Sequence, residues 1–275
     1  MTDDNPYSTI LTERIGLVER ITLNRPEKRN ALSMQLQEEL IDAVHAAERT
    51  NEVRVIIIRG AGSSFCSGYD INPGRAEADS LRPRTIEQDV ALTISFGERW
   101  GQIWNCRIPV IAQVHGYCIA GGTDLALHCD LIVTARDAKF GFPPVRAQGA
   151  PPTHMWLYHV GPQWSKRLLL TGDTISGAEA AAIGLVLEAV PADDLEEHVL
   201  ALARRIANIG HDLLVHNKRI VNLGGADGAE SDAGARWNPD ALAHQAPEAL
   251  DFSERLREKG VRAAAAERDA KFEKR

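Results

Sequence analysis

The chain has few cysteines, no cluster of basic residues and no long apolar run, and each shortage argues against a class of protein. Its four cysteines form no CxxC pair and lie at no metal-ligand spacing from a histidine, so we expect no metal site and reduced thiols. Lys and Arg number 31 against 38 Asp and Glu, which disfavours nucleic acid as a partner. No apolar run approaches the ~20 residues that a membrane span needs.

The first six residues are acidic and polar, and they lack the basic and apolar regions of a signal peptide. Together with reduced thiols, this predicts a cytoplasmic protein. A length of 275 residues with 44% hydrophobic content is enough for one sizeable core, or for a core with a small helical appendage.

Strand and helix patterns alternate along the first 190 residues, which predicts an α/β fold with crossover connections. Val53–Ile58 is almost continuously apolar and β-branched, as expected of a strand that is buried on both faces. Further strands are expected at 15–23, 110–114, 131–134, 139–142 and 186–190. Helices are expected after the N-cap Ser33, at 86–104, from about Gly121, after the capping box Ser176–Glu179 and from Asp193. Loops are expected at 72–84 and 224–234, and a weakly amphipathic helical tail at 241–275.

Two glycine-rich stretches, Gly60–Ile71 and His115–Leu125, each follow a predicted buried strand. Glycine allows a backbone to approach a ligand closely and to adopt positive φ. The second stretch also opens a helix, whose free N–H groups and dipole converge on one spot. Two such backbone donors can hold an oxyanion, so the pattern points to an enolate or a tetrahedral carbonyl intermediate.

Four motifs in the chain resemble those of the crotonase (enoyl-CoA hydratase/isomerase) superfamily, in that family's order and spacing. They are Leu23-Asn-Arg-Pro-Glu-Lys-Arg-Asn-Ala-Leu-Ser33, Phe65-Cys-Ser-Gly-Tyr-Asp-Ile71, Gly116-Tyr-Cys-Ile-Ala-Gly-Gly-Thr-Asp-Leu-Ala-Leu-His-Cys-Asp130 and Leu170-Thr-Gly-Asp-Thr-Ile-Ser176. The resemblance implies a spiral of repeated β-β-α units with an acyl-CoA site in residues 1–200. It also implies a C-terminal helical region, residues 201–275, that packs between subunits of a trimer or a dimer of trimers. Coenzyme A is expected as part of the substrate, with no permanently bound cofactor.

By the same resemblance, the backbone N–H groups of Tyr69 and Gly121 form an oxyanion hole for the thioester. Asp124 matches the first of the two carboxylates used by hydratases of the family, although an acid at this helical position also suits a plain cap. Arg25 and Lys28 match a turn that meets the adenosine and phosphates of coenzyme A. Ser67, Asp70, Ile71 and Asn72 are expected along the rest of the cofactor, while Asp70 could also brace its own turn.

The second carboxylate of the hydratases has no counterpart, because Pro144 follows Phe140-Gly-Phe-Pro at that position. Proline cannot carry a proton, so hydration by two carboxylates is not expected. His154 is a candidate acid–base group, since its side chain can titrate near neutral pH; Arg146, Tyr158 and Glu98 are further candidates. Two alternatives stay open: a thioester hydrolase or C–C bond-cleaving enzyme, and a non-catalytic acyl-CoA-binding subunit.

Overall fold

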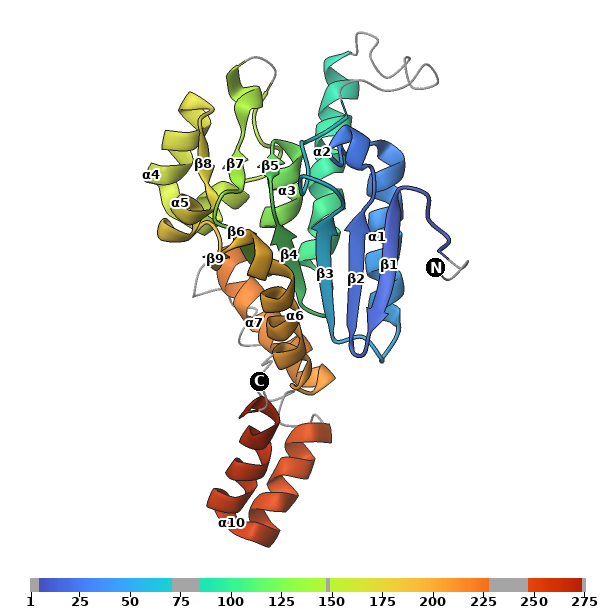
Figure 1. Ribbon diagram of the computed structural model, residues 1–275, viewed down its shortest axis with the longest axis vertical. Coiled ribbons are helices and arrows are strands. Elements are labelled where there is room, and N and C mark those ends of the chain that lie inside the picture. The colour runs from blue at the N-terminus through green and yellow to red at the C-terminus, as the bar shows by residue number, and fades with distance from the viewer. Residues whose placement is uncertain (1–4, 71–84, 147–148, 228–246, 274–275) are drawn as a thin grey trace.

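A six-stranded sheet in the order β1-β2-β3-β4-β6-β9 forms the centre of the computed structural model, which describes residues 5–70, 85–146, 149–227 and 247–273 (Figure 1). The strands are β1 (Ile10–Ile15), β2 (Val18–Leu23), β3 (Val55–Gly60), β4 (Val110–Val114), β6 (Leu131–Ala135) and β9 (Glu188–Val190). The first two form an antiparallel hairpin, and every other pairing in this sheet is parallel. Parallel pairing requires the crossover connections that the alternating pattern predicts.

Helices cover both faces of this sheet, which is why β3 and β4 are buried almost throughout. The helices α1 (Met34–Arg49) and α2 (Ile86–Trp104) lie on one side, and α6 (Leu195–Ala207) packs against the other (Figure 1). The Ser33 hydroxyl accepts a hydrogen bond from the N–H of Leu36 at 3.2 Å and so begins α1 as predicted.

A second, three-stranded sheet consists of β5 (Tyr117–Ile119), β7 (Lys139–Gly141) and β8 (Thr174–Ser176). The helix α3 (Gly121–Leu127) follows β5, and η3 (Pro143–Arg146) follows β7. The chain then continues through α4 (Met155–Thr171) and α5 (Gly177–Ala182). Gly116 permits the passage from β4 into β5, because its φ is 56° and a Cβ there would lie 2.0 Å from the carbonyl oxygen of Ser63. This close approach places the second glycine stretch directly against the first.

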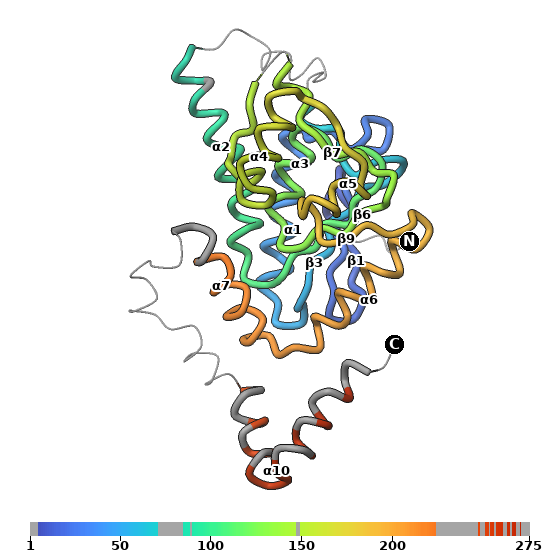
Figure 2. Tube along the Cα trace, turned by 90° about the vertical axis from the view of Figure 1, so that its left-hand side faces the viewer, coloured from blue at the N-terminus to red at the C-terminus, as the bar shows by residue number. Residues whose placement is uncertain are grey.

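The C-terminal part of the described chain is helical. After η4 (Ala192–Asp194) and α6 come α7 (His211–Asp227) and α10 (Pro247–Glu273). A largely buried ion pair anchors α7 to the sheet, since the Lys218 ammonium lies 2.7 Å from the Asp130 carboxylate. The segment α10 consists of two helical arms that meet at Gly260, where φ is 80°, and it projects away from the body of the molecule (Figure 1 and Figure 2).

Most predicted elements are present at the expected places, including α1, α2, α3 and the capping box that begins α5. The predicted strand at 15–23 was wrong in its first residues, because Gly16 makes a turn and β1 precedes it. The predicted loop at 224–234 was also wrong at its start, where α7 continues to Asp227. The predicted loop at 72–84 lies outside the described residues, and the predicted division at residue 200 falls within α6.

Candidate active site

The two glycine stretches meet edge to edge in front of α3. The N–H of Cys66 donates to the carbonyl of Tyr117 at 2.8 Å, and the N–H of Ile119 donates to the carbonyl of Cys66 at 3.2 Å. A Cβ on Gly68 would lie 2.8 Å from the Cβ of Ala120 and 3.4 Å from the nitrogen of Gly121. The absence of a side chain at position 68 therefore lets the backbone before Tyr69 reach the start of α3.

Tyr69 and Gly121 each present a backbone N–H that has no partner in the described part of the chain. Leu32 bridges the backbone on either side of Tyr69, since its N–H donates to the Gly68 carbonyl and its carbonyl accepts from Asp70. Gly121 is the first residue of α3, where no intrahelical acceptor exists. Within the described ranges, neither N–H donates to another residue. Two free donors on neighbouring segments, one at a helix N-terminus, are suited to binding a negatively charged oxygen.

The Tyr69 side chain fills the space between the start of α3 and α2. Its ring stacks on Phe96 with 4.4 Å between ring centroids, and it lies so close to the Cα of Gly121 that a Cβ there would be 2.8 Å from the ring. The indole N–H of Trp100 donates to the Tyr69 hydroxyl at 2.9 Å, and that hydroxyl donates to Asp124 at 3.2 Å. Phe96 and Trp100 were missed in the sequence; their spacing of four residues on one helix was the available signal.

Asp124 is buried on α3, with only 1% of its surface exposed. Burial raises the pKa of this carboxyl to about 7, and the hydrogen bond from Tyr69 opposes that rise. Ala120 is the N-cap of α3 and makes no side-chain cap, and its carbonyl accepts from the N–H groups of Thr123 and Asp124. The Asp124 carboxyl lies in the first turn of α3 and bonds to Tyr69, so the dipole alternative and the catalytic one both stay predictions. It is a buried acid that can change protonation near neutral pH.

The thiols of Cys66 and Cys118 lie beside this acid and are fully buried. Burial raises the pKa of Cys66 to about 12 and that of Cys118 well above its ordinary value. Thiols that stay protonated at neutral pH are poor nucleophiles, which agrees with the structural role expected of small buried side chains.

Arg25 and Asp70, both predicted to contact coenzyme A, contact each other. The Arg25 guanidinium lies 2.8 Å from the Asp70 carboxylate in a part-buried ion pair. Asn30 further connects the Arg25 turn to the first glycine stretch, because its amide donates to the carbonyls of Ala61 and Ser64 and accepts from the N–H of Arg25. Asp70 thus braces its turn.

The other predicted coenzyme A residues lie near this turn or outside the described chain. The Ser67 hydroxyl lies 3.3 Å from the carbonyl oxygen of Lys28, whose side chain is exposed. Ile71 and Asn72 lie outside the described residues. All six assignments to coenzyme A stay predictions.

The remaining acid–base candidates lie elsewhere. His154 is exposed at the start of α4 and makes no capping bond, and Tyr158 packs edge-on against Trp104. Arg146 donates to Thr171 and pairs with Asp173, and Glu98 is exposed on α2. In the described part of the chain, no hydrogen bond joins any of these four candidates to Tyr69 or Asp124. Pro144 lies in η3.

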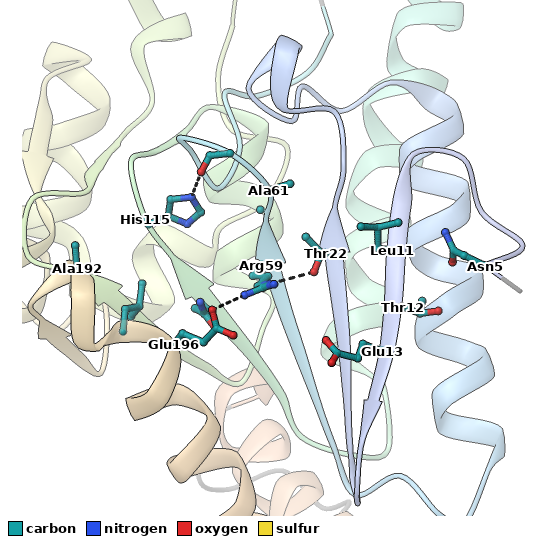
Figure 3. A pocket seen from close by; sticks show the side chains of 14 residues that line it. Asn5, Leu11, Thr12, Glu13, Thr22, Arg59, Ala61, His115, Ala192 and Glu196 are labelled. Carbon is teal, nitrogen blue, oxygen red and sulfur yellow. Dashed lines mark hydrogen bonds and ion pairs between the residues drawn. The ribbon is translucent and has the colours of Figure 1, made fainter. Parts of the chain in front are cut away.

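A separate cavity of about 970 Å³ lies on the other face of the large sheet (Figure 3). Arg59 crosses it, donating to Thr22 and pairing with Glu196, and the His115 ring bonds to the carbonyl of Gly62. These charged groups neutralise one another, and none of the predicted catalytic residues lines the cavity. The unpaired N–H groups and the buried acid instead place the candidate chemistry at Tyr69, Gly121 and Asp124.

Comparison with known proteins identifies the family. The sequence model described as Enoyl-CoA hydratase/isomerase matches residues 13–274. The chain belongs to the enoyl-CoA hydratase/isomerase family. A probable enoyl-CoA hydratase of Mycobacterium bovis is 35% identical over 219 residues, covering 78% of this chain and 82% of that protein. The 2,3-dehydroadipyl-CoA hydratase of Escherichia coli is 31% identical over 205 residues, covering 73% and 76%.

Solved structures of this family share the fold. An enoyl-CoA hydratase from Mycobacterium smegmatis aligns with a TM-score of 0.75 at 35% identity, covering 96% of this chain and 94% of that one. A second structure from the same organism reaches a TM-score of 0.82 at 26% identity, covering 92% and 97%. The predicted α/β crotonase-type fold is confirmed. Within the described ranges, no helix has the length and apolar character to cross a membrane. Nor does any group of three or more His, Cys, Asp or Glu there form a candidate metal site.

Proposed function

We propose that this chain is a hydratase- or isomerase-type acyl-CoA enzyme whose chemistry passes through a thioester enolate or oxyanion. The N–H groups of Tyr69 and Gly121 bind the thioester oxygen, and Asp124 exchanges the proton. The observation that carries the proposal is the pair of unpaired N–H groups beside a buried carboxyl whose pKa is raised to about 7. An acid with that pKa has both protonation states available at neutral pH, which is what proton exchange with a substrate requires.

We expect the substrate to be bound partly through its coenzyme A moiety. Arg25, Lys28, Ser67 and Asp70 form one joined surface beside the oxyanion donors, and the proposal places the nucleotide and pantetheine there together with Ile71 and Asn72. The Arg25–Asp70 pair then acts as a brace that fixes the turn. Lys28 is the side chain left exposed to meet phosphate.

Pro144 supports a second candidate, an enzyme that hydrolyses the thioester or cleaves a C–C bond with Asp124 as its single carboxylate. Because proline occupies the place of the second acid, we expect the wild type to hydrate crotonyl-CoA slowly. A chain that only binds acyl-CoA would neither hydrate nor hydrolyse it.

The test is to incubate the wild type with crotonyl-CoA and to follow enoyl-thioester absorbance and free thiol in parallel, with binding measured by calorimetry. Loss of absorbance without thiol supports hydration, thiol release supports hydrolysis, and binding alone supports the non-catalytic alternative. Pro144→Glu should raise hydration, since acid–base help is worth roughly 10²–10⁴-fold. Pro143→Glu, which places the same acid one residue earlier in η3, is the control and should not raise it.

A further inference from the structure

The Tyr69 hydroxyl lies between a buried donor and a buried acid. The Trp100 indole N–H donates to its oxygen at 2.9 Å, and the hydroxyl donates to Asp124 at 3.2 Å. Both neighbours are almost fully enclosed, with 0% of Trp100 and 1% of Asp124 exposed. Tyr69 is the side chain of this group that reaches toward the ligand side, because its ring lies against the Cα of Gly121.

We propose that Tyr69 is a catalytic residue through its side chain as well as its backbone, its hydroxyl passing a proton between Asp124 and the bound acyl thioester. This inference rests on the proposed function and deepens it. The Asp124 carboxyl is 1% exposed and has the Tyr69 hydroxyl as its hydrogen-bond partner in the described chain. The acid therefore needs a group between itself and a substrate.

The phenol oxygen of Tyr69 carries one proton and can also accept hydrogen bonds. The direction in which this proton points therefore depends on the protonation state of Asp124. When Asp124 is ionised, the Tyr69 proton points at the carboxylate while Trp100 donates to the oxygen. When Asp124 is protonated, Asp124 and Trp100 both donate to the oxygen, and the Tyr69 proton is free to turn toward the substrate. The 3.2 Å separation exceeds the roughly 2.5–2.7 Å of a charge-assisted O–H···O⁻ bond, so the hydroxyl is not locked onto the carboxylate.

The step balances without a second acid. With Asp124 ionised, an α-C–H bond of the acyl group breaks and its proton joins the Tyr69 oxygen, while the Tyr69 proton passes to Asp124. The electron pair of the C–H bond stays on the substrate as the enolate, whose oxygen is held by the N–H groups of Tyr69 and Gly121. The reverse transfers return a proton to carbon and leave Asp124 ionised.

The other titratable groups around α3 are not expected to exchange a proton with Asp124 near neutral pH, which leaves Tyr69 as its partner. Burial raises the pKa of the thiols and lowers the pKa of both buried imidazoles, that of His128 to about 4, so these four groups stay neutral. In the described part of the chain, burial also raises the pKa of the Cys129 thiol, which bonds to the Leu125 carbonyl of α3, and the exposed His154 lies at the start of α4.

The experiment measures exchange of the α-hydrogens of butanoyl-CoA with D₂O by mass spectrometry, which reports enolate formation whatever the later step. Tyr69→Phe keeps the backbone N–H and removes only the hydroxyl, and it should slow exchange by roughly 10²–10⁴-fold with little change in butanoyl-CoA affinity. Tyr7→Phe is the matched control, because it removes an exposed tyrosine–carboxylate bond, 2.7 Å from the Tyr7 hydroxyl to Asp42 on α1. Equal exchange by Tyr69→Phe and wild type would overturn the inference.

A second readout separates a relay from a packing role. Infrared difference spectroscopy of the ligand-free protein should show the Asp124 carboxyl titrating near pH 7 in the wild type, and at higher pH in Tyr69→Phe, which lacks the bond that favours the ionised form. An unmoved midpoint would overturn the inference. Combining Tyr69→Phe with Asp124→Asn should slow exchange little more than either change alone, whereas additive losses would show separate roles.

The two proposals fail in different ways. A wild type that exchanges no α-hydrogen refutes the enolate function itself, and the infrared midpoint then still decides whether Tyr69 and Asp124 are coupled. Should Tyr69→Phe not fold, 3-fluorotyrosine at position 69 keeps the size of the ring and makes its hydroxyl more acidic. An exchange rate equal to that of the wild type at every pH would then count against the relay.

Discussion

Replacing Asp124 with Asn should stabilise the protein at pH 8 far more than at pH 5. Burial raises the pKa of this carboxyl from 3.8 to about 7, so between these values the folded state binds a proton that the unfolded state has released. Stability therefore falls as the pH rises through this window. At about 1.4 kcal/mol per pH unit, the full difference is on the order of 4 kcal/mol, of which roughly 2 kcal/mol is lost between pH 5 and pH 7.

Asparagine keeps the shape of the side chain and an oxygen acceptor for Tyr69, but it does not ionise. The variant should therefore not lose this stability as the pH rises. Urea unfolding followed by circular dichroism at pH 5, 6, 7 and 8 gives the free energies of unfolding of both proteins. The free energy of unfolding of Asp124→Asn, minus that of the wild type, should increase by about 3 kcal/mol from pH 5 to pH 8. Asp137→Asn, which changes an exposed carboxylate, is the control and should show a constant gap. A constant gap for Asp124→Asn as well would refute the burial argument.

Three further predictions concern the start of α3 and the assembly. Ala120 has φ 52° and ψ −125°, which an L-residue rarely adopts, so Ala120→Gly should raise the free energy of unfolding by about 1–3 kcal/mol in the same urea assay; a loss would show that the methyl group matters more than the strain. Gly121→Pro removes an oxyanion donor and should cost roughly 2.7–4 kcal/mol in kcat, measured against Gly121→Ala, which also meets the Tyr69 ring but keeps the N–H. Equal rates for these two variants would exclude the donor role. Light scattering at micromolar concentration should report a trimer or a dimer of trimers, and a monomer would contradict this assembly.

Local rules predicted the parts of the fold that depend on neighbouring residues. Ser33 begins α1 and Ser176 begins α5 because a hydroxyl three residues before a free N–H is sufficient to cap a helix. Val53–Ile58 is apolar except at Arg54, as expected for a strand whose two faces are covered. The short strands β5 and β8 were missed, since each has three residues and is defined by pairing with β7 rather than by its own pattern.

The site was predictable only as far as its backbone. The two glycine stretches pointed to a pair of backbone donors, because glycine permits close approach, and the family resemblance assigned these donors to Tyr69 and Gly121. The sequence predicted a role for the Tyr69 backbone and no particular contact of its side chain. Its bond to Trp100 spans 31 residues of sequence and depends on how α2 lies against the glycine stretches, which no local pattern encodes. The raised pKa of Asp124 likewise follows from burial by distant segments.

Asn30 has a consequence for laboratory recombination of this fold. It is fully buried, and its amide bonds only to main-chain atoms, at Arg25, Ala61 and Ser64. A contact with main-chain atoms does not depend on the exposed side chains of the opposite segment, although Gly60 must stay glycine because a Cβ there would lie 2.7 Å from the Asn30 amide nitrogen. Libraries that randomise the exposed positions of the first glycine stretch should therefore retain the loop shape as long as Asn30 is kept. Chimeras that replace Asn30 should lose that shape even when every residue of the stretch is native.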